Sequence, residues 1–137
     1  MPSCSPSSAL RRYPTPTRSN PRVLAWFEAT AKKSLYTSVL VLGEHRRGVE
    51  QARHRDAAKS DALERSNQQA TVRFHGRCLP VDRDVCEIWG RTTAHRPVAI
   101  VDVLLGATAK THSMTYVTRN TKDVANLGVA LLDPFAT

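Results

Sequence analysis

Short apolar segments alternate with longer helical patterns through most of the chain, and this alternation constrains the fold more than any other feature. Residues 35–37, 78–81, 114–118 and 129–132 are rich in apolar and β-branched side chains and predict strands. Helical spacing predicts helices between them. Strands that alternate with helices usually form a parallel sheet covered on both faces. The sequence therefore predicts an α/β protein with a mostly parallel central sheet.

The expected helices are defined by their apolar spacing and by their first residues. Ser38 and Asp82 are suitable N-cap residues, and Pro21 suits a first helical position. After Asp82, helical spacing predicts a buried face. The expected helices cover residues 21–33, 38–53, 54–67 and 100–112, with a further helix after Asp82 that buries Val85, Ile88 and Trp89.

Residues 1–21 differ sharply in composition from the rest of the chain. The segment MPSCSPSSALRRYPTPTRSNP is dominated by Ser, Pro, Thr and Arg, and Leu10 and Tyr13 are almost its only large apolar side chains. Because proline cannot donate a hydrogen bond to a sheet, we expect no central strand here. We expect residues 1–21 to form a disordered segment and residues 22–137 to form a single domain.

The chain is basic, and this limits its partners. It has 20 Lys and Arg against 12 Asp and Glu, a formal net charge of +8 and a pI near 10.0. This balance favours an acidic partner such as nucleic acid or an acidic protein. The cysteines, Cys4, Cys78 and Cys86, lie far apart without zinc-finger spacing, so neither a disulfide framework nor structural zinc is expected. No apolar run is long enough to cross a bilayer, so we expect no membrane partner and a cytoplasmic location.

Three acidic residues lie where parallel α/β sheets usually build their sites, at the carboxyl ends of strands. Asp102 is in the first turn of an expected helix, Asp123 follows an expected strand, and Glu44 lies within an apolar helical segment. Each also has a structural explanation. Asp102 suits the positive end of a helix dipole, Asp123 could cap a turn, and Glu44 could pair with Arg47. Taken singly, Asp102 and Asp123 are better explained by structure, whereas the apolar neighbours Val41, Leu42 and Val49 make a wholly exposed position less suitable for Glu44. None of the three is sufficient evidence of chemistry by itself.

Together, these acidic residues occur in segments that resemble three motifs of PIN-domain ribonucleases of the VapC toxin type. The segment YTSVLVLGE, which ends at Glu44 and is followed by HRRG, resembles the second motif. The segment VDVLLGATA at 101–109 resembles the third, and TYVTRN at 115–120 with Asp123 resembles the fourth. The order and spacing of these segments resemble the family over roughly residues 22–135.

The first motif of the family, an apolar strand that ends in Asp, has no counterpart here. No Asp or Glu precedes Glu28. From the abrupt change of composition near Pro21, we expect the amino end of this chain to differ from that of active relatives. The sheet and the acidic site are then each expected to lack one component.

The resemblance implies a PIN-like three-layer α/β/α fold and a function as the toxin of a type II toxin–antitoxin system. It implies a divalent-metal-dependent endoribonuclease in which Asp102, Glu44 and Asp123 are catalytic residues and ligands of Mg²⁺ or Mn²⁺. Thr118 and Asn120 would hydrogen-bond these ligands, and Arg119 would contact phosphate. The implied partners are a VapB-like antitoxin, an RNA substrate and a second copy of the chain.

Two alternatives remain open at this point. One is a catalytically impaired PIN-like protein that binds only an antitoxin or nucleic acid. The other is a general basic nucleic-acid-binding module, whose affinity would fall steeply with salt and would not depend on Glu44 or Asp102.

Overall fold

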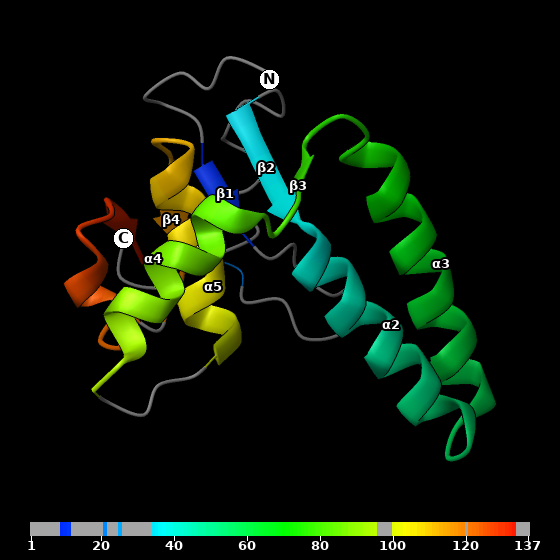
Figure 1. Ribbon diagram of the computed structural model, residues 1–137. Helices are drawn as coiled ribbons and strands as arrows, with labels where there is room; N and C mark the ends of the chain where they lie inside the picture. The colour runs from blue at the N-terminus through cyan, green and yellow to red at the C-terminus, as the bar shows by residue number, and fades with distance from the viewer. Residues whose placement is uncertain are drawn as a thin grey trace.

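A five-stranded parallel sheet organises the protein. The structure, a computed structural model, describes residues 9–11, 21, 25, 34–95, 100–119 and 121–133. The strand order is β3-β2-β1-β4-β5, and every neighbouring pair is parallel. The predicted α/β class with a parallel sheet is confirmed (Figure 1). The strands are β1 (Ala9–Arg11), β2 (Leu35–Ser38), β3 (Cys78–Leu79), β4 (Thr115–Val117) and β5 (Leu131–Leu132).

The central strand, β1, comes from the segment that was not expected to form one, so that expectation is wrong. Leu10 lies in register with Tyr36 of β2 on one side and Tyr116 of β4 on the other. The strand is three residues long, and no proline falls within it. A short central strand forms when its backbone groups pair with a neighbouring strand on each side. The amino-acid composition of the surrounding segment does not reveal whether such partners are available.

Two other expectations for the amino-terminal part fall mostly outside the described residues. The expected helix at 21–33 is described only at Pro21 and Ala25, which are both helical and exposed. The expected disorder of residues 1–21 can be compared with the structure only at Ala9–Arg11, which form β1.

A helical hairpin, α2 (Val39–Arg53) and α3 (Ala57–Arg73), projects from the sheet after β2 (Figure 1). The predicted cap is confirmed, because the Ser38 side chain accepts a hydrogen bond from the Leu40 backbone N–H at 3.1 Å. Asp56 caps α3 in the same way. Helix α3 extends further toward the carboxyl end than the predicted helix 54–67 and ends at Arg73. Gln68 and Gln69 are exposed on it, so their polarity suits a helix that faces solvent there.

The remaining helices, α4 (Arg83–Thr93) and α5 (Ile100–Thr111), pack on the sheet region. Asp82 caps α4 by accepting a hydrogen bond from the Val85 backbone N–H at 3.1 Å, as predicted. Helix α5 contacts β1 and β4, and α4 packs on α5 (Figure 1). Both fully buried and partly buried apolar side chains join these elements. The buried cluster includes Leu35, Val41, Phe74, Leu79, Val103, Leu105, Tyr116, Val117, Val124 and Leu127, with Ile88 and Trp89 packed against it.

Gly106 sets how closely α5 approaches the elements beneath it. A Cβ at this position would lie 2.6 Å from Leu127 Cδ1 and 3.3 Å from Val124 Cγ1. Both neighbours are almost fully buried and have no free space to move into. The helix can therefore lie close to η2 (Ala125–Leu127) only because residue 106 has no side chain.

Candidate functional site

Elements at the carboxyl edge of the sheet carry the three predicted acidic residues. Glu44 is in the second turn of α2, the helix that begins where β2 ends. Asp123 lies between β4 and η2. Asp102 is in the first turn of α5, and α5 leads directly into β4 and packs against it. Because a short connection reverses the chain between α5 and β4, the first turn of α5 lies toward the carboxyl end of β4. The topology therefore directs all three acidic positions to the same edge of the sheet.

Asp102 is held by a tyrosine of the sheet. The hydroxyl of Tyr116 donates a hydrogen bond to Asp102 Oδ1 at 3.4 Å. Tyr116 is only 1% exposed, and its ring belongs to the core, while Asp102 is partly buried. This contact connects the middle of β4 to the first turn of α5 and gives the carboxylate a neutral donor. Tyr116 is not among the residues predicted from the sequence, although a tyrosine in a buried strand usually needs a partner for its hydroxyl.

The segment after β4 carries the remaining predicted residues. The backbone N–H of Thr118 donates to the Leu132 carbonyl at 2.9 Å, which extends the pairing of β4 with β5. Thr118 and Asp123 are partly buried, and Arg119 is exposed. Asn120 lies outside the described residues. Val124, which is fully buried directly after Asp123, anchors the far end of this segment in the core. The backbone around the predicted site is therefore fixed on both sides.

Glu44, Asp102 and Asp123 lie in the described part of the chain but do not belong to a cluster of three or more metal-donor side chains there. Over residues 9–11, 34–95, 100–119 and 121–133, no three or more His, Cys, Asp or Glu side chains are grouped so that they could hold one. Hard divalent ions take oxygen ligands, and Mg²⁺ is usually held by one or two carboxylates together with waters and substrate phosphates. In addition, β1 ends at Arg11 and is followed by Arg12, where the PIN pattern would have Asp. The roles of Glu44, Asp102 and Asp123 as metal ligands stay a prediction.

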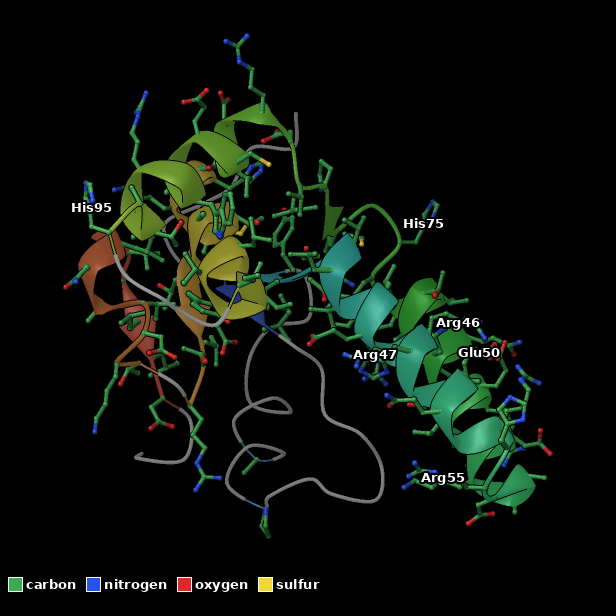
Figure 2. All side chains as sticks on the ribbon, turned by 60° about the horizontal axis from the view of Figure 1, so that its bottom comes forward. Arg46, Arg47, Glu50, Arg55, His75 and His95 are labelled. Carbon is green, nitrogen blue, oxygen red and sulfur yellow. The ribbon has the colours of Figure 1, made fainter. Side chains whose placement is uncertain are left out.

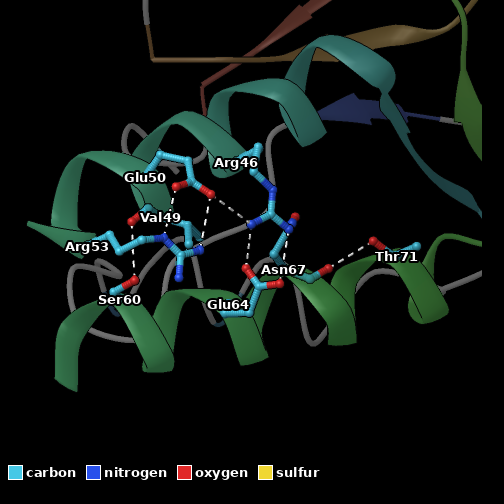
Figure 3. Close-up of polar contacts among 8 residues, drawn as sticks. All are labelled: Arg46, Val49, Glu50, Arg53, Ser60, Glu64, Asn67 and Thr71. Atoms are coloured by element: carbon cyan, nitrogen blue, oxygen red, sulfur yellow. Dashed lines mark hydrogen bonds and ion pairs between the residues drawn. The ribbon is translucent and has the colours of Figure 1, made fainter. Parts of the chain in front are cut away.

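The hairpin carries a network of ion pairs on the side where α2 faces α3 (Figure 3). Arg46 donates two hydrogen bonds to Glu64, at 2.6 and 3.0 Å, and its guanidinium lies 3.6 Å from Glu50. Arg53 donates to Glu50 at 2.9 and 3.1 Å. The hydrogen bond from Arg46 lowers the pKa of Glu64, and the one from Arg53 lowers the pKa of Glu50. Both carboxylates are therefore firmly ionised at neutral pH.

An open recess lies at the carboxyl end of α3, and none of the predicted acidic residues lines it. It is lined by Gln68, Gln69, Val72, Arg73 and Arg77. Arg77 donates to the Leu35 carbonyl at 2.8 Å and stacks over the Phe74 ring at 5.4 Å. These contacts give Arg77 a structural role, since they attach the end of α3 to β2.

The fold and the arrangement of acidic positions define a class of protein. The sequence matches the PIN domain family over residues 17–128, and the chain belongs to this family. Among known proteins it is 33% identical over 122 residues to Toxin FitB of Neisseria gonorrhoeae, across 85% of this chain and 86% of that protein.

Solved structures agree with this assignment. The crystal structure of FitAcB from Neisseria gonorrhoeae superposes with a TM-score of 0.82 at 30% identity and covers 94% of this chain and 99% of that one. VapBC-5 from Mycobacterium tuberculosis has a TM-score of 0.64 at 22% identity over 93% of this chain and 97% of that one, which supports the fold alone. Within the described part of the chain, we find no helix with the length and apolar character to span a membrane.

Proposed function

We propose that this chain is the toxin component of a toxin–antitoxin pair and that its target is RNA. The observation that carries the proposal is its 33% identity to Toxin FitB over most of both chains. The arrangement of Glu44, Asp102 and Asp123 on elements at one edge of the sheet supports it further. A net charge of +8 suits a polyanionic target.

The proposed protein partner is an antitoxin of the VapB kind. Solved relatives with this fold include FitAB bound to a DNA fragment and a toxin–antitoxin complex from Klebsiella pneumoniae. A homodimer and a cytoplasmic location are part of the same proposal. Sedimentation of the purified chain, alone and with its antitoxin, tests the dimer, and cell fractionation tests the location.

Cleavage and binding make different demands on the same site. For cleavage of RNA phosphodiester bonds, the proposed catalytic residues are Glu44, Asp102 and Asp123, with Thr118 and Asn120 as hydrogen-bonding neighbours and Arg119 as a phosphate contact. Mg²⁺ or Mn²⁺ would be the cofactor. The second candidate is a PIN protein that binds its antitoxin or RNA without cleaving RNA. The sequence feature that favours this second candidate is the pair Arg11 and Arg12, which stands where the family has its first Asp.

Incubation of a labelled mixed-sequence RNA with the purified chain distinguishes the two candidates. The reactions contain Mg²⁺, Mn²⁺ or a chelator, and each is analysed both for cleavage and for retarded RNA. The matched variants are Asp102→Asn, which alters the predicted site, and Asp61→Asn, which alters an exposed aspartate of α3.

Each result has a clear meaning. Cleavage that requires metal, disappears in Asp102→Asn and survives in Asp61→Asn supports the nuclease. Retarded RNA without cleavage, equal in chelator and in metal, supports the binding-only candidate. Folded protein that neither cleaves nor retains RNA contradicts the proposal of an RNA target.

A further inference from the structure

The two sides of helix α2 differ in how their charges are neutralised. On the side toward α3, Arg46 and Arg53 form ion pairs with Glu64 and Glu50. Figure 2 shows Arg46 and Glu50 on this side and Arg47 and Arg55 on the opposite one. Within the part of the chain that the structure describes, the side chains of Arg47 and Arg55 form no ion pair or hydrogen bond, and both are exposed. Neighbouring arginines in the sequence therefore have different surroundings.

The side with the unpaired arginines continues to the predicted site. Successive helical residues are separated by about 100°, so residues 44, 47 and 51 of α2 lie along one stripe. Figure 2 shows Arg55, in the turn after α2, on the same side as Arg47. This stripe consists of Glu44, Arg47, Gln51 and Arg55, with Gly48 beside it. It runs from a predicted catalytic position in the second turn of α2 to the tip of the hairpin just after α2 ends. At a rise of about 1.5 Å per residue, Arg47 lies roughly 9 Å along the axis from Arg53, the last residue of α2, and Arg55 follows two residues later.

We propose that the Arg47–Arg55 stripe, which begins on α2 and ends in the turn after it, binds the phosphate backbone of single-stranded RNA and leads that strand to the carboxyl edge of the sheet. This inference rests on the proposed function, because it assumes that RNA is the target. The spacing suits it, since stacked nucleotides place one charge about every 3.4 Å along a strand. Two arginines separated by more than about 9 Å can contact separate phosphates of one strand. An arginine presents several donors in a planar fork, which is well suited to phosphate oxygens.

The chemistry of the stripe favours RNA over a protein partner. Protein interfaces depend on a few large apolar or aromatic side chains that fill pockets in the partner. The stripe has none, because its members are a carboxylate, two guanidinium groups, an amide and a glycine. Phosphate contacts need only cationic donors and carry no demand for apolar burial.

The test measures binding of a fluorescein-labelled single-stranded RNA by anisotropy, in chelator so that no cleavage can interfere. The variant is the double substitution Arg47→Gln with Arg55→Gln. Its matched control is Arg53→Gln with Arg65→Gln, which removes the same charge from the other side of α2 and from exposed α3. Circular dichroism and thermal unfolding of each protein show whether it is folded.

The stripe variant is expected to bind the RNA about tenfold more weakly than the wild type. The slope of log affinity against log salt concentration should become shallower by about 1.4, because each lost phosphate contact to a single strand contributes about 0.7. The control variant is expected to keep most of the affinity and nearly the full slope.

Three outcomes would overturn the inference, and they can be told apart. If the stripe variant binds RNA as well as the control does, the stripe is not the path of the strand, although RNA remains the target. If the variant keeps RNA binding and loses an antitoxin, the stripe is a protein-docking surface. If the folded wild-type chain binds no RNA at all, the proposed function itself fails, and the stripe inference fails with it.

Discussion

The sheet region and the α2–α3 hairpin are held together by different forces. The sheet region buries apolar side chains such as Val103, Leu105 and Leu127 almost completely, and its close packing leaves no room even for a methyl group at Gly106. The two helices of the hairpin meet through the Arg46–Glu64 ion pair and small side chains, with fewer large apolar residues between them. The difference indicates that the sheet region supplies most of the stability, while the hairpin is a charged arm whose form depends more on pH and salt.

Phe74 tests how firmly the hairpin depends on the sheet region, and it should give the largest effect. It ends α3, is 1% exposed and packs in the same cluster as Leu35 and Leu79. Phe74→Ala should lower the free energy of unfolding by about 3–5 kcal/mol, because it removes a buried ring and leaves a cavity. Urea unfolding followed by circular dichroism measures this change.

The matched control for Phe74 lies two residues earlier. Val72 is 78% exposed, so Val72→Ala should change the free energy of unfolding by no more than about 0.5 kcal/mol. A loss at Phe74 as small as the loss at Val72 would mean that the hairpin is not attached to the core as described.

Alanine substitutions at two glycines, one in the sheet region and one in the hairpin, should change the stability by intermediate amounts and in opposite directions. Gly106→Ala should destabilise the protein by about 1–3 kcal/mol, because the added methyl group overpacks a closed interior. Gly43→Ala in α2 meets no atom within 4 Å and should stabilise the protein by up to about 1 kcal/mol through helix propensity. Thermal unfolding of both variants in one buffer measures the two signs. Stabilisation by Gly106→Ala would contradict the close packing of α5.

The smallest expected effect is on how the melting temperature depends on pH in the acid range, through an ion pair of the hairpin. The hydrogen bond from Arg46 lowers the pKa of Glu64 below its ordinary value of 4.5. Because the pKa is lowered in the folded state, the ion pair stabilises the protein at pH values above the ordinary pKa of glutamate. This stabilisation is lost as the pH falls through the lowered pKa of the folded protein. Glu64→Gln should therefore make the melting temperature less dependent on pH in the acid range. Melting curves from about pH 6 to about pH 3 measure this, and parallel curves for both proteins would argue against a role for the pair.

Much of the fold after residue 34 could be predicted because local signals and tertiary structure agree there. Ser38 is a suitable cap between a β-branched segment and a helical pattern, and it caps α2. Asp82 does the same for α4. The small and apolar residues of 100–112 correctly predicted α5, which ends at Thr111. In each case the capping residue or the periodicity is contained within a few neighbouring positions.

The prediction failed where the determining contacts are distant in the sequence. Strand β1 exists because β2 and β4 offer backbone partners on both sides, and these lie far along the chain. The Tyr116–Asp102 hydrogen bond and the Arg46–Glu64 pair likewise join different elements. For the site, the sequence indicated which acidic positions would face one edge of the sheet, but it could not show how their side chains would be grouped.

The position of β1 has a consequence for the order in which the protein can be assembled. It is the only link between the β2–β3 pair and the β4–β5 pair in the described sheet. As the chain emerges during synthesis, the first strand can dock on β2 early, but its second edge stays open until residues 115–117 arrive. Two-stranded ribbons are barely stable by themselves. The last third of the chain must therefore reach the first before the sheet is complete, and the unfinished protein exposes a strand edge until then.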